Sequence, residues 1–355
     1  MSTNEGAPKL VRDAMFYFSS GDLIVQSAVD ASDISTLFRV DKSLLSFNSP
    51  VFAGMFSLPN SSGQELYDGA PVVQVTEPAT ELHKLFTALH NASTLSIPRF
   101  DPYIPTRLTP VMRLVMKYEF NNLHARVVDI MNENWPQTFE HWMRFRAEVA
   151  VIEELHASAA DGLVDGRSFE ERIPEPASAI RFARMFDVPS VLPFAFYTLS
   201  GIPLSNDWDA VRSARRDEAA RQVRTAKWGL LDIADHRAVM QCRERLGREL
   251  GEVLYSYTRA DLLMERTMAD TCASADECAN AFTQLVEAWQ DCETGVLREE
   301  AIGSAAGTPD PLGLLEDLYN SRPEWAMCAD CCDRLQKCIR ESQHTVWRGL
   351  DNMEI

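Results

Sequence analysis

Cysteines are the residues best suited to chemistry, and all eight lie after residue 241 of the 355-residue chain. Cys328 and Cys331 form a C-x-x-C pair, and Cys272 and Cys278 form a second pair at wider spacing. Thiolates two residues apart can bind one zinc ion, and two such pairs complete a tetrahedral site. We therefore expect these four cysteines to hold a structural zinc ion that fastens the last helix to the preceding helical region.

Other roles for these cysteines compete with zinc binding. Small apolar thiols are often buried between helices, and the x-5 spacing of Cys272 and Cys278 is unusual for a zinc site. A thioredoxin-like redox role is disfavoured, since no βαβ pattern surrounds the C-x-x-C pair. The N-terminus is polar and has no apolar signal segment. We therefore expect an intracellular protein, cytoplasmic or nuclear, with reduced cysteines and no disulfide framework.

Motifs for catalysis are missing from the sequence. The seven histidines fall on expected helices or at their ends, and no glycine-rich phosphate loop or G-x-S-x-G elbow occurs. We therefore expect no enzymatic activity and no other cofactor. The rival hypothesis is an enzyme whose site lies in the helical region, which would require a deep pocket with convergent histidines or carboxylates.

The charge balance bears on partners. Lys and Arg number 34 against 52 Asp and Glu, a net charge of −18 that repels nucleic acid. A run of arginines between residues 212 and 224 is interpreted as a solvated helix face, and a zinc-assisted nucleic-acid binder is the weaker alternative. The longest uncharged stretch, 188–206, contains three prolines, so we expect no membrane span.

Helices must position the cysteines, because apolar residues follow helical spacing almost throughout from Thr138 onward. The predicted helices cover residues 138–157, 176–186, 190–200, 207–228, 237–269, 276–291, 311–320 and 325–348. The segments 162–176 and 294–311 are expected to be loops.

The first third of the chain has a different pattern. Strands are predicted near 23–26, 36–40 and 72–75, with short helices between the second and third. Asp41 is expected to cap the first helix, and Ser49 followed by Pro50 to start the second. Residues 91–108 are expected to be irregular, with Thr109-Pro110 opening the next helix.

Four segments of this region resemble a BTB/POZ domain, most closely those of mushroom-forming (basidiomycete) fungi. They are Tyr17–Gln26, Phe38–Pro59, Tyr67–Val75 and Leu114–Phe120. Asp41 stands where the family usually has His. The signature residues carried over by the resemblance are Asp22, Phe38, Asp41, Leu44, Leu45, Phe52, Met55, Phe56, Lys117 and Tyr118.

The resemblance implies an α+β fold: a BTB/POZ domain, with a three-stranded sheet and helical hairpins, followed by an all-α region. The expected boundaries are a flexible leader over 1–14, the BTB/POZ domain over 15–133, a helical region over 134–270 and a cysteine-bearing helical region over 271–355. Most apolar residues between Leu44 and Phe56 are expected in the core.

The function implied is protein–protein interaction, as a homodimer or an adaptor that docks a protein partner. The alternative is a substrate adaptor for a cullin-type ubiquitin ligase. Such adaptors often carry an apolar-x-Glu motif before the third strand, and here Gly63 precedes Glu65 at that position. The missing apolar residue argues against cullin recruitment.

Overall fold

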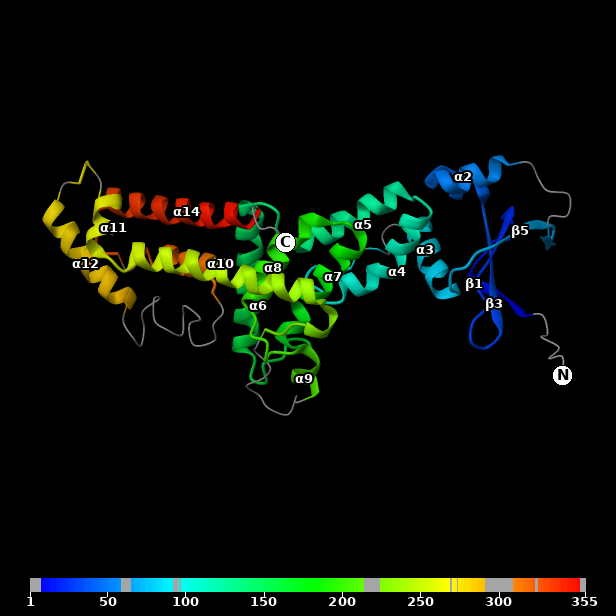
Figure 1. The fold of residues 1–355 in the computed structure, drawn as a ribbon, viewed down its shortest axis with the longest axis horizontal. Coiled ribbons are helices and arrows are strands. Elements are labelled where there is room, and N and C mark those ends of the chain that lie inside the picture. Colours follow the sequence, from blue (N-terminus) through cyan, green and yellow to red (C-terminus); the bar gives the residue numbers. More distant parts are fainter. Residues whose placement is uncertain are drawn as a thin grey trace. The chain divides into compact units, whose positions relative to one another are not determined.

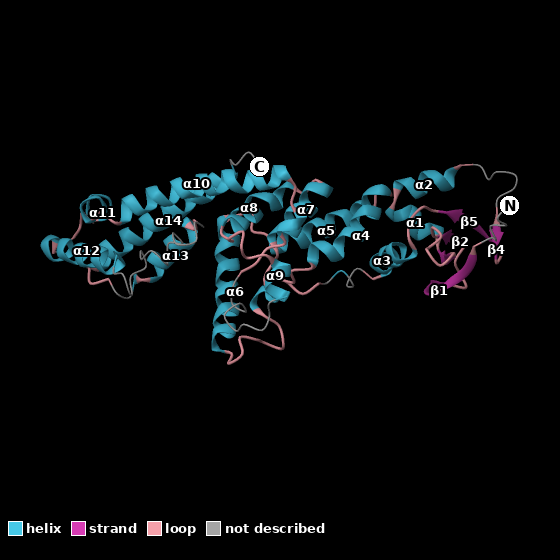
Figure 2. Cartoon of the chain, turned by 60° about the horizontal axis from the view of Figure 1, so that its bottom comes forward, coloured by secondary structure: helices cyan, strands magenta, loops and turns pink. Residues whose placement is uncertain are grey.

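The computed structural model describes residues 8–58, 65–91, 95, 97–213, 224–268, 270–272, 274–290, 309–322 and 325–351. The chain divides into two compact units, Met1–Asn134 and Trp135–Ile355. Within the described residues, all five strands lie in the first unit and the second unit is built from helices (Figure 1, Figure 2). A mixed fold with an N-terminal sheet followed by helices is therefore confirmed.

The sheet has five strands, where the sequence predicted three, in the order β1-β3-β2-β5-β4. The strands are β1 (Lys9–Tyr17), β2 (Leu23–Gln26), β3 (Ile34–Val40), β4 (Leu66–Tyr67) and β5 (Ala70–Gln74). β3 pairs parallel with β1 and antiparallel with β2, and β2 pairs parallel with β5. The central strand β2 is buried along its whole length.

Strand β1 corrects the prediction of a flexible leader over residues 1–14. The strand begins at Lys9, and residues 1–7 lie outside the described part. β1 is an edge strand whose side chains are mostly exposed, so its sequence lacks the alternation of apolar and polar residues that marks a half-buried strand. The backbone ladder to β3 holds it in place, and sequence periodicity does not report such a ladder.

The described residues of the first unit also form the helices α1 (Lys42–Asn48), α2 (Pro50–Ser57), α3 (Ala79–His90), α4 (Ile104–Lys117) and α5 (Asn121–Asn134). As predicted, Ser49 caps α2, and its Oγ atom accepts a hydrogen bond from the backbone N–H of Phe52 at 3.1 Å. Asp41 makes no side-chain cap for α1, contrary to expectation. Instead, Asp22 Oδ1 accepts from the backbone N–H of Lys42 at 2.7 Å.

Helix α4 also differs from its prediction. It begins at Ile104, with Pro105 in its first turn, so the end of the expected irregular segment 91–108 is helical. Pro110 lies inside the helix rather than at its start. Two prolines in one segment each resemble a helix start, and the sequence pattern alone selected the wrong one.

The second unit contains α6 (Phe139–Ser158), α7 (Pro176–Phe186), α8 (Leu192–Ser200), α9 (Trp208–Ser213), α10 (Ile233–Tyr257), α11 (Ala260–Thr267), α12 (Ala275–Gln290), α13 (Pro311–Asn320) and α14 (Ala329–Asp351). The helix predicted over 207–228 is confirmed only over α9. Residues 214–223, which hold part of the arginine run, lie outside the described residues. The helix predicted over 237–269 is two helices, α10 and α11.

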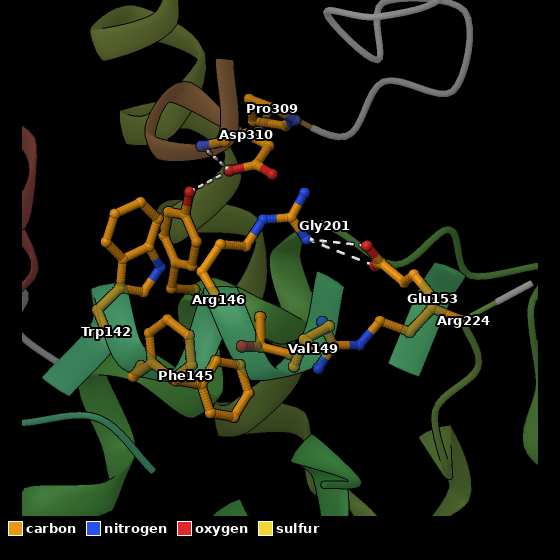
Figure 3. A pocket seen from close by; sticks show the side chains of 13 residues that line it. Trp142, Phe145, Arg146, Val149, Glu153, Gly201, Arg224, Pro309 and Asp310 are labelled. Atoms are coloured by element: carbon orange, nitrogen blue, oxygen red, sulfur yellow. Dashed lines mark hydrogen bonds and ion pairs between the residues drawn. The ribbon is translucent and has the colours of Figure 1, made fainter. Parts of the chain in front are cut away.

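A cavity of about 370 Å³ lies in this unit, among side chains of α6 and α8 and the start of α13 (Figure 3). Trp142, Phe145 and Phe194 contribute aromatic surface to it, and Arg146 and Arg224 contribute positive charge. In the described part of the chain, no helix combines the length and the apolar character that crossing a membrane requires.

Candidate functional site

The starts of two helices position the four predicted zinc ligands. Cys272 lies in the connection between α11 and α12, and Cys278 lies in the first turn of α12. Cys328 comes directly before α14, and Cys331 lies in its first turn. Each pair therefore places one cysteine before a helix and one inside it, and the x-5 spacing of the first pair serves this purpose as well as C-x-x-C does.

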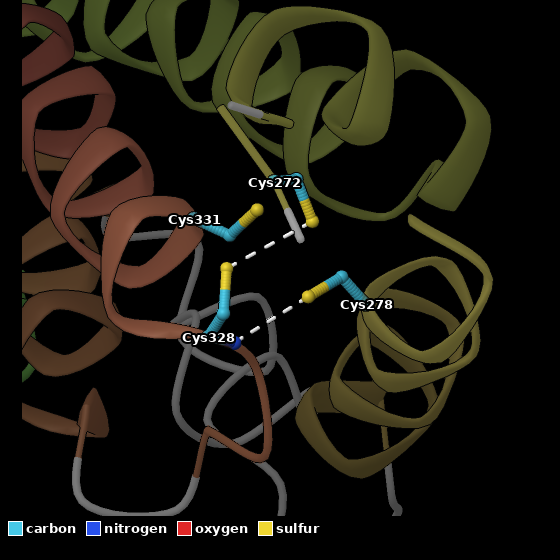
Figure 4. A group of neighbouring side chains, drawn as sticks. All are labelled: Cys272, Cys278, Cys328 and Cys331. Atoms are coloured by element: carbon cyan, nitrogen blue, oxygen red, sulfur yellow. Dashed lines mark hydrogen bonds between the residues drawn. The ribbon is translucent and has the colours of Figure 1, made fainter. Parts of the chain in front are cut away.

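The four sulfur atoms converge, all within 4.8 Å of one another (Figure 4). The Sγ atoms of Cys328 and Cys272 are 3.8 Å apart. A tetrahedral zinc site with Zn–S bonds of about 2.3 Å has sulfur atoms separated by about 3.8 Å. The predicted clustering is thus confirmed, at separations that suit a tetrahedral metal ion.

Hydrogen bonds around the cluster join its two halves. The backbone N–H of Cys328 donates to Cys278 Sγ at 3.4 Å, and Thr271 Oγ1 donates to Asp330 Oδ2 at 2.8 Å. Arg334 forms an ion pair with Asp270 at 3.3 Å. Outer contacts of this kind orient metal ligands and hold them in place. They fasten the α11–α12 connection to the start of α14.

The surroundings of the cluster favour a thiolate at Cys328. Cys278 and Cys331 are buried, and Cys272 and Cys328 are partly buried. The pKa of Cys328 is lowered, chiefly by hydrogen bonds from the backbone and side chain of Cys331. The backbone N–H of Cys328 acts to lower the pKa of Cys278, but burial and the thiols of Cys272 and Cys328 outweigh it, so that the pKa of Cys278 is raised. The N-termini of α12 and α14 carry partial positive charge, which also stabilises anionic sulfur. Deprotonated sulfur is the form that binds zinc.

The remaining described cysteines behave differently. Cys242, Cys332 and Cys338 are buried free thiols, and Cys292 lies outside the described residues. Tyr257 donates its hydroxyl to Cys338 Sγ at 3.8 Å, which satisfies a buried polar group. For these three residues, the alternative of thiols packed between helices fits.

In the first unit, the Lys-Tyr pair of the signature meets a carboxylate that sequence reasoning missed. Glu77 is buried, forms an ion pair with Lys117 and accepts a hydrogen bond from the Tyr118 hydroxyl at 2.7 Å. The Tyr118 ring stacks on Phe52, with ring centres 4.9 Å apart. Ser49 Oγ donates to the Tyr118 carbonyl. This network joins α2, α4 and the connection before α3.

Burial divides the other signature residues. Phe38, Leu45 and Phe52 are buried, whereas Leu44, Met55 and Phe56 are partly buried. Most apolar residues from Leu44 to Phe56 were expected in the core, but only Leu45 and Phe52 are fully buried, and Phe47 is 84% and Val51 38% exposed. Helices of two turns bury one face, and the sequence places apolar residues on the other face as well.

Comparison with known proteins adds no assignment. No protein-family model matches the chain, and neither curated proteins nor solved structures give a match. The geometry described above is therefore the basis for any functional conclusion.

Proposed function

We propose that the chain acts by protein–protein association without catalysis, through an N-terminal unit of the BTB/POZ type that pairs with a second copy of itself. The observation that carries this proposal is the α1–α2 surface, defined as Phe47, Val51 and Leu58. These side chains are 84%, 38% and 66% exposed. Large apolar side chains exposed close together in the chain are typical of interaction sites on soluble proteins.

The low charge of the α1–α2 segment permits a second copy as the occupant. Residues 42–58, which contain the α1–α2 surface, carry a single charged side chain, Lys42. The whole chain has a net charge of −18, so two copies repel each other over most of their surfaces. The nearly uncharged segment is where two chains can approach without opposing carboxylates, in a symmetric contact that uses the same patch twice.

Light scattering coupled to size-exclusion chromatography tests this proposal. The full chain should have about twice the monomer mass of 39.9 kDa. Phe47→Asp should give the monomer mass, because two carboxylates would be buried against each other. The control is Tyr255→Asp, since Tyr255 is a similarly exposed aromatic residue of the second unit, 62% exposed. A monomeric wild type, or a Phe47→Asp variant that stays dimeric, would contradict the proposal.

We also propose that Cys272, Cys278, Cys328 and Cys331 hold one zinc ion. The donor set supports this, because four thiolates form a closed tetrahedral shell with no open position for substrate. Such an ion is structural: it fastens the start of α14 to the α11–α12 connection and leaves the unit without catalytic metal.

Elemental analysis of protein purified under reducing conditions tests the metal. We expect one zinc per chain, lost in Cys278→Ser and retained in Cys242→Ser, since Cys242 is a buried thiol outside the cluster. Zinc absent from the wild type, or present at the same level in Cys278→Ser, would remove the proposal. The zinc content of these proteins does not depend on whether the chain is a monomer or a dimer, so this test is separate from the test of self-association.

A further inference from the structure

The cavity of the second unit is lined by Arg224, whose guanidinium carries two unsatisfied buried donors. The Nε and Nη2 atoms of Arg224 are buried and have no hydrogen-bond partner (Figure 3). Burial lowers the pKa of Arg224 to about 10. Glu153 and Asp310 attract its charge, but two buried N–H groups that make no hydrogen bond are unfavourable, because they have lost their hydration.

The carboxylates at the cavity already have donors. Glu153 lies 3.4 Å from Arg146, and Asp310 accepts hydrogen bonds from the Tyr197 hydroxyl and from the backbone N–H of Gly313. Asp310 therefore caps α13, and Glu153 pairs with Arg146, so neither carboxylate hydrogen-bonds to Arg224. Among the described residues, the Nε and Nη2 atoms of Arg224 are left as unpaired donors at the cavity wall.

We propose that this cavity binds a small organic oxyanion, whose phosphate or carboxylate group pairs with Arg224 while its apolar part contacts the aromatic wall. A guanidinium binds both kinds of oxyanion in a bidentate manner. Small-molecule sites have volumes of about 300–1,000 Å³ and combine apolar walls with a few polar groups. The cavity has a volume of about 370 Å³, and Trp142, Phe145 and Phe194 provide its apolar wall.

This site goes beyond the association proposed above, and its failure would not affect that proposal. The cavity lies within the second unit, and neither the α1–α2 surface nor the four clustered cysteines line it. A ligand there would be a small molecule carried or sensed by the helical unit.

Thermal unfolding of the full chain tests the site with three probes: inorganic phosphate, phenyl phosphate and benzoate, each against sodium chloride at equal ionic strength. We expect at least one probe to raise the unfolding temperature by about 5 °C at saturation. A larger rise in unfolding temperature with phenyl phosphate than with inorganic phosphate would show that the aromatic wall contributes to binding. A rise with benzoate and with neither phosphate probe would indicate a carboxylate ligand. Each of these results supports the proposal.

Variants connect the response to the residue. Arg224→Met should abolish the response, and the matched control Arg248→Met, at an exposed position of α10, should retain it. If Arg224→Met does not fold, Arg224→Lys should weaken the apparent affinity at least about tenfold, because a single ammonium cannot pair in a bidentate manner. A response no larger than that to sodium chloride, or one that persists without Arg224, would overturn the proposal.

Discussion

Replacing Ser49 with alanine should destabilise the first unit by about 3 kcal/mol. Ser49 is fully buried, and its Oγ atom serves two elements. It accepts from the backbone N–H of Phe52, which caps α2, and it donates to the carbonyl of Tyr118 at the end of α4. Losing a cap costs about 1 kcal/mol, and leaving a buried carbonyl without a partner costs about 1–3 kcal/mol.

Amide hydrogen exchange of the full chain, read by mass spectrometry, measures this change in the first unit separately from the second. Peptides covering β2 and β3 should exchange about 100-fold faster in Ser49→Ala, since about 1.4 kcal/mol corresponds to a factor of ten. Ser57→Ala is the control, because Ser57 Oγ bonds only to Gly54 on the exposed end of α2 and its loss should change exchange less than about twofold. Unchanged exchange in Ser49→Ala, or an equal effect of Ser57→Ala, would refute the role assigned to Ser49.

Three further predictions concern other parts of the chain. Ser321→Ala should lower the unfolding temperature of the helical unit by about 9 °C in calorimetry, because Ser321 Oγ accepts from the indole N–H groups of Trp289 and Trp325 at 3.0 and 3.1 Å; no change would refute this. Burial raises the pKa of Glu77, but the hydrogen bond and charge of Lys117 and other donors outweigh it, so the net pKa is lowered. The ionised Glu77 therefore stabilises the fold above the ordinary pKa of a glutamate, and this contribution is lost as pH falls through the lowered pKa. Glu77→Gln should make the unfolding free energy fall less steeply between neutral and acidic pH. An unchanged pH dependence would contradict this role of Glu77. A zinc chelator should increase amide exchange in α12 and α14 and leave the first-unit sheet unchanged, whereas uniform or absent changes would argue against a local metal.

The cysteine cluster was predictable because its signal is local. Each pair occupies a helix start, and helix starts are readable from short-range patterns of apolar and capping residues. With one pair of cysteines at each of two helix starts, few ways of packing the helices bring all four sulfur atoms together. The partner contacts, Thr271 with Asp330 and Arg334 with Asp270, could not be anticipated, since they join segments about sixty residues apart.

The errors come from interactions that are distant in sequence. Asp41 has the residue type of a helix cap, but the carboxylate that accepts the first backbone N–H of α1 belongs to Asp22. Asp22 lies between β1 and β2, about twenty residues earlier in the chain, and only the folded sheet brings it there. β1 is held by its ladder to β3, and Glu77 is identified only by the lysine and tyrosine that reach it from α4. Arg224 belongs to a run interpreted as a solvated helix face, and only the tertiary structure places it at a cavity.

The BTB/POZ assignment of the first unit stays a prediction that rests on the four resembling segments. For this molecule, the prediction means that the first unit binds another chain through its apolar α1–α2 surface. Phe52 is buried and stacks on Tyr118, which holds α2 and its exposed side chains in place.

Photo-crosslinking from position 47 tests directly whether the α1–α2 surface contacts a second copy of the chain. A benzophenone amino acid in place of Phe47 would be irradiated in a mixture of isotopically light and heavy full-length chains, and the crosslinked peptides identified by mass spectrometry. We expect mixed light–heavy crosslinks from position 47 to residues 42–58 of the second copy. Crosslinks confined to a single chain, or mixed crosslinks to other segments only, would contradict it.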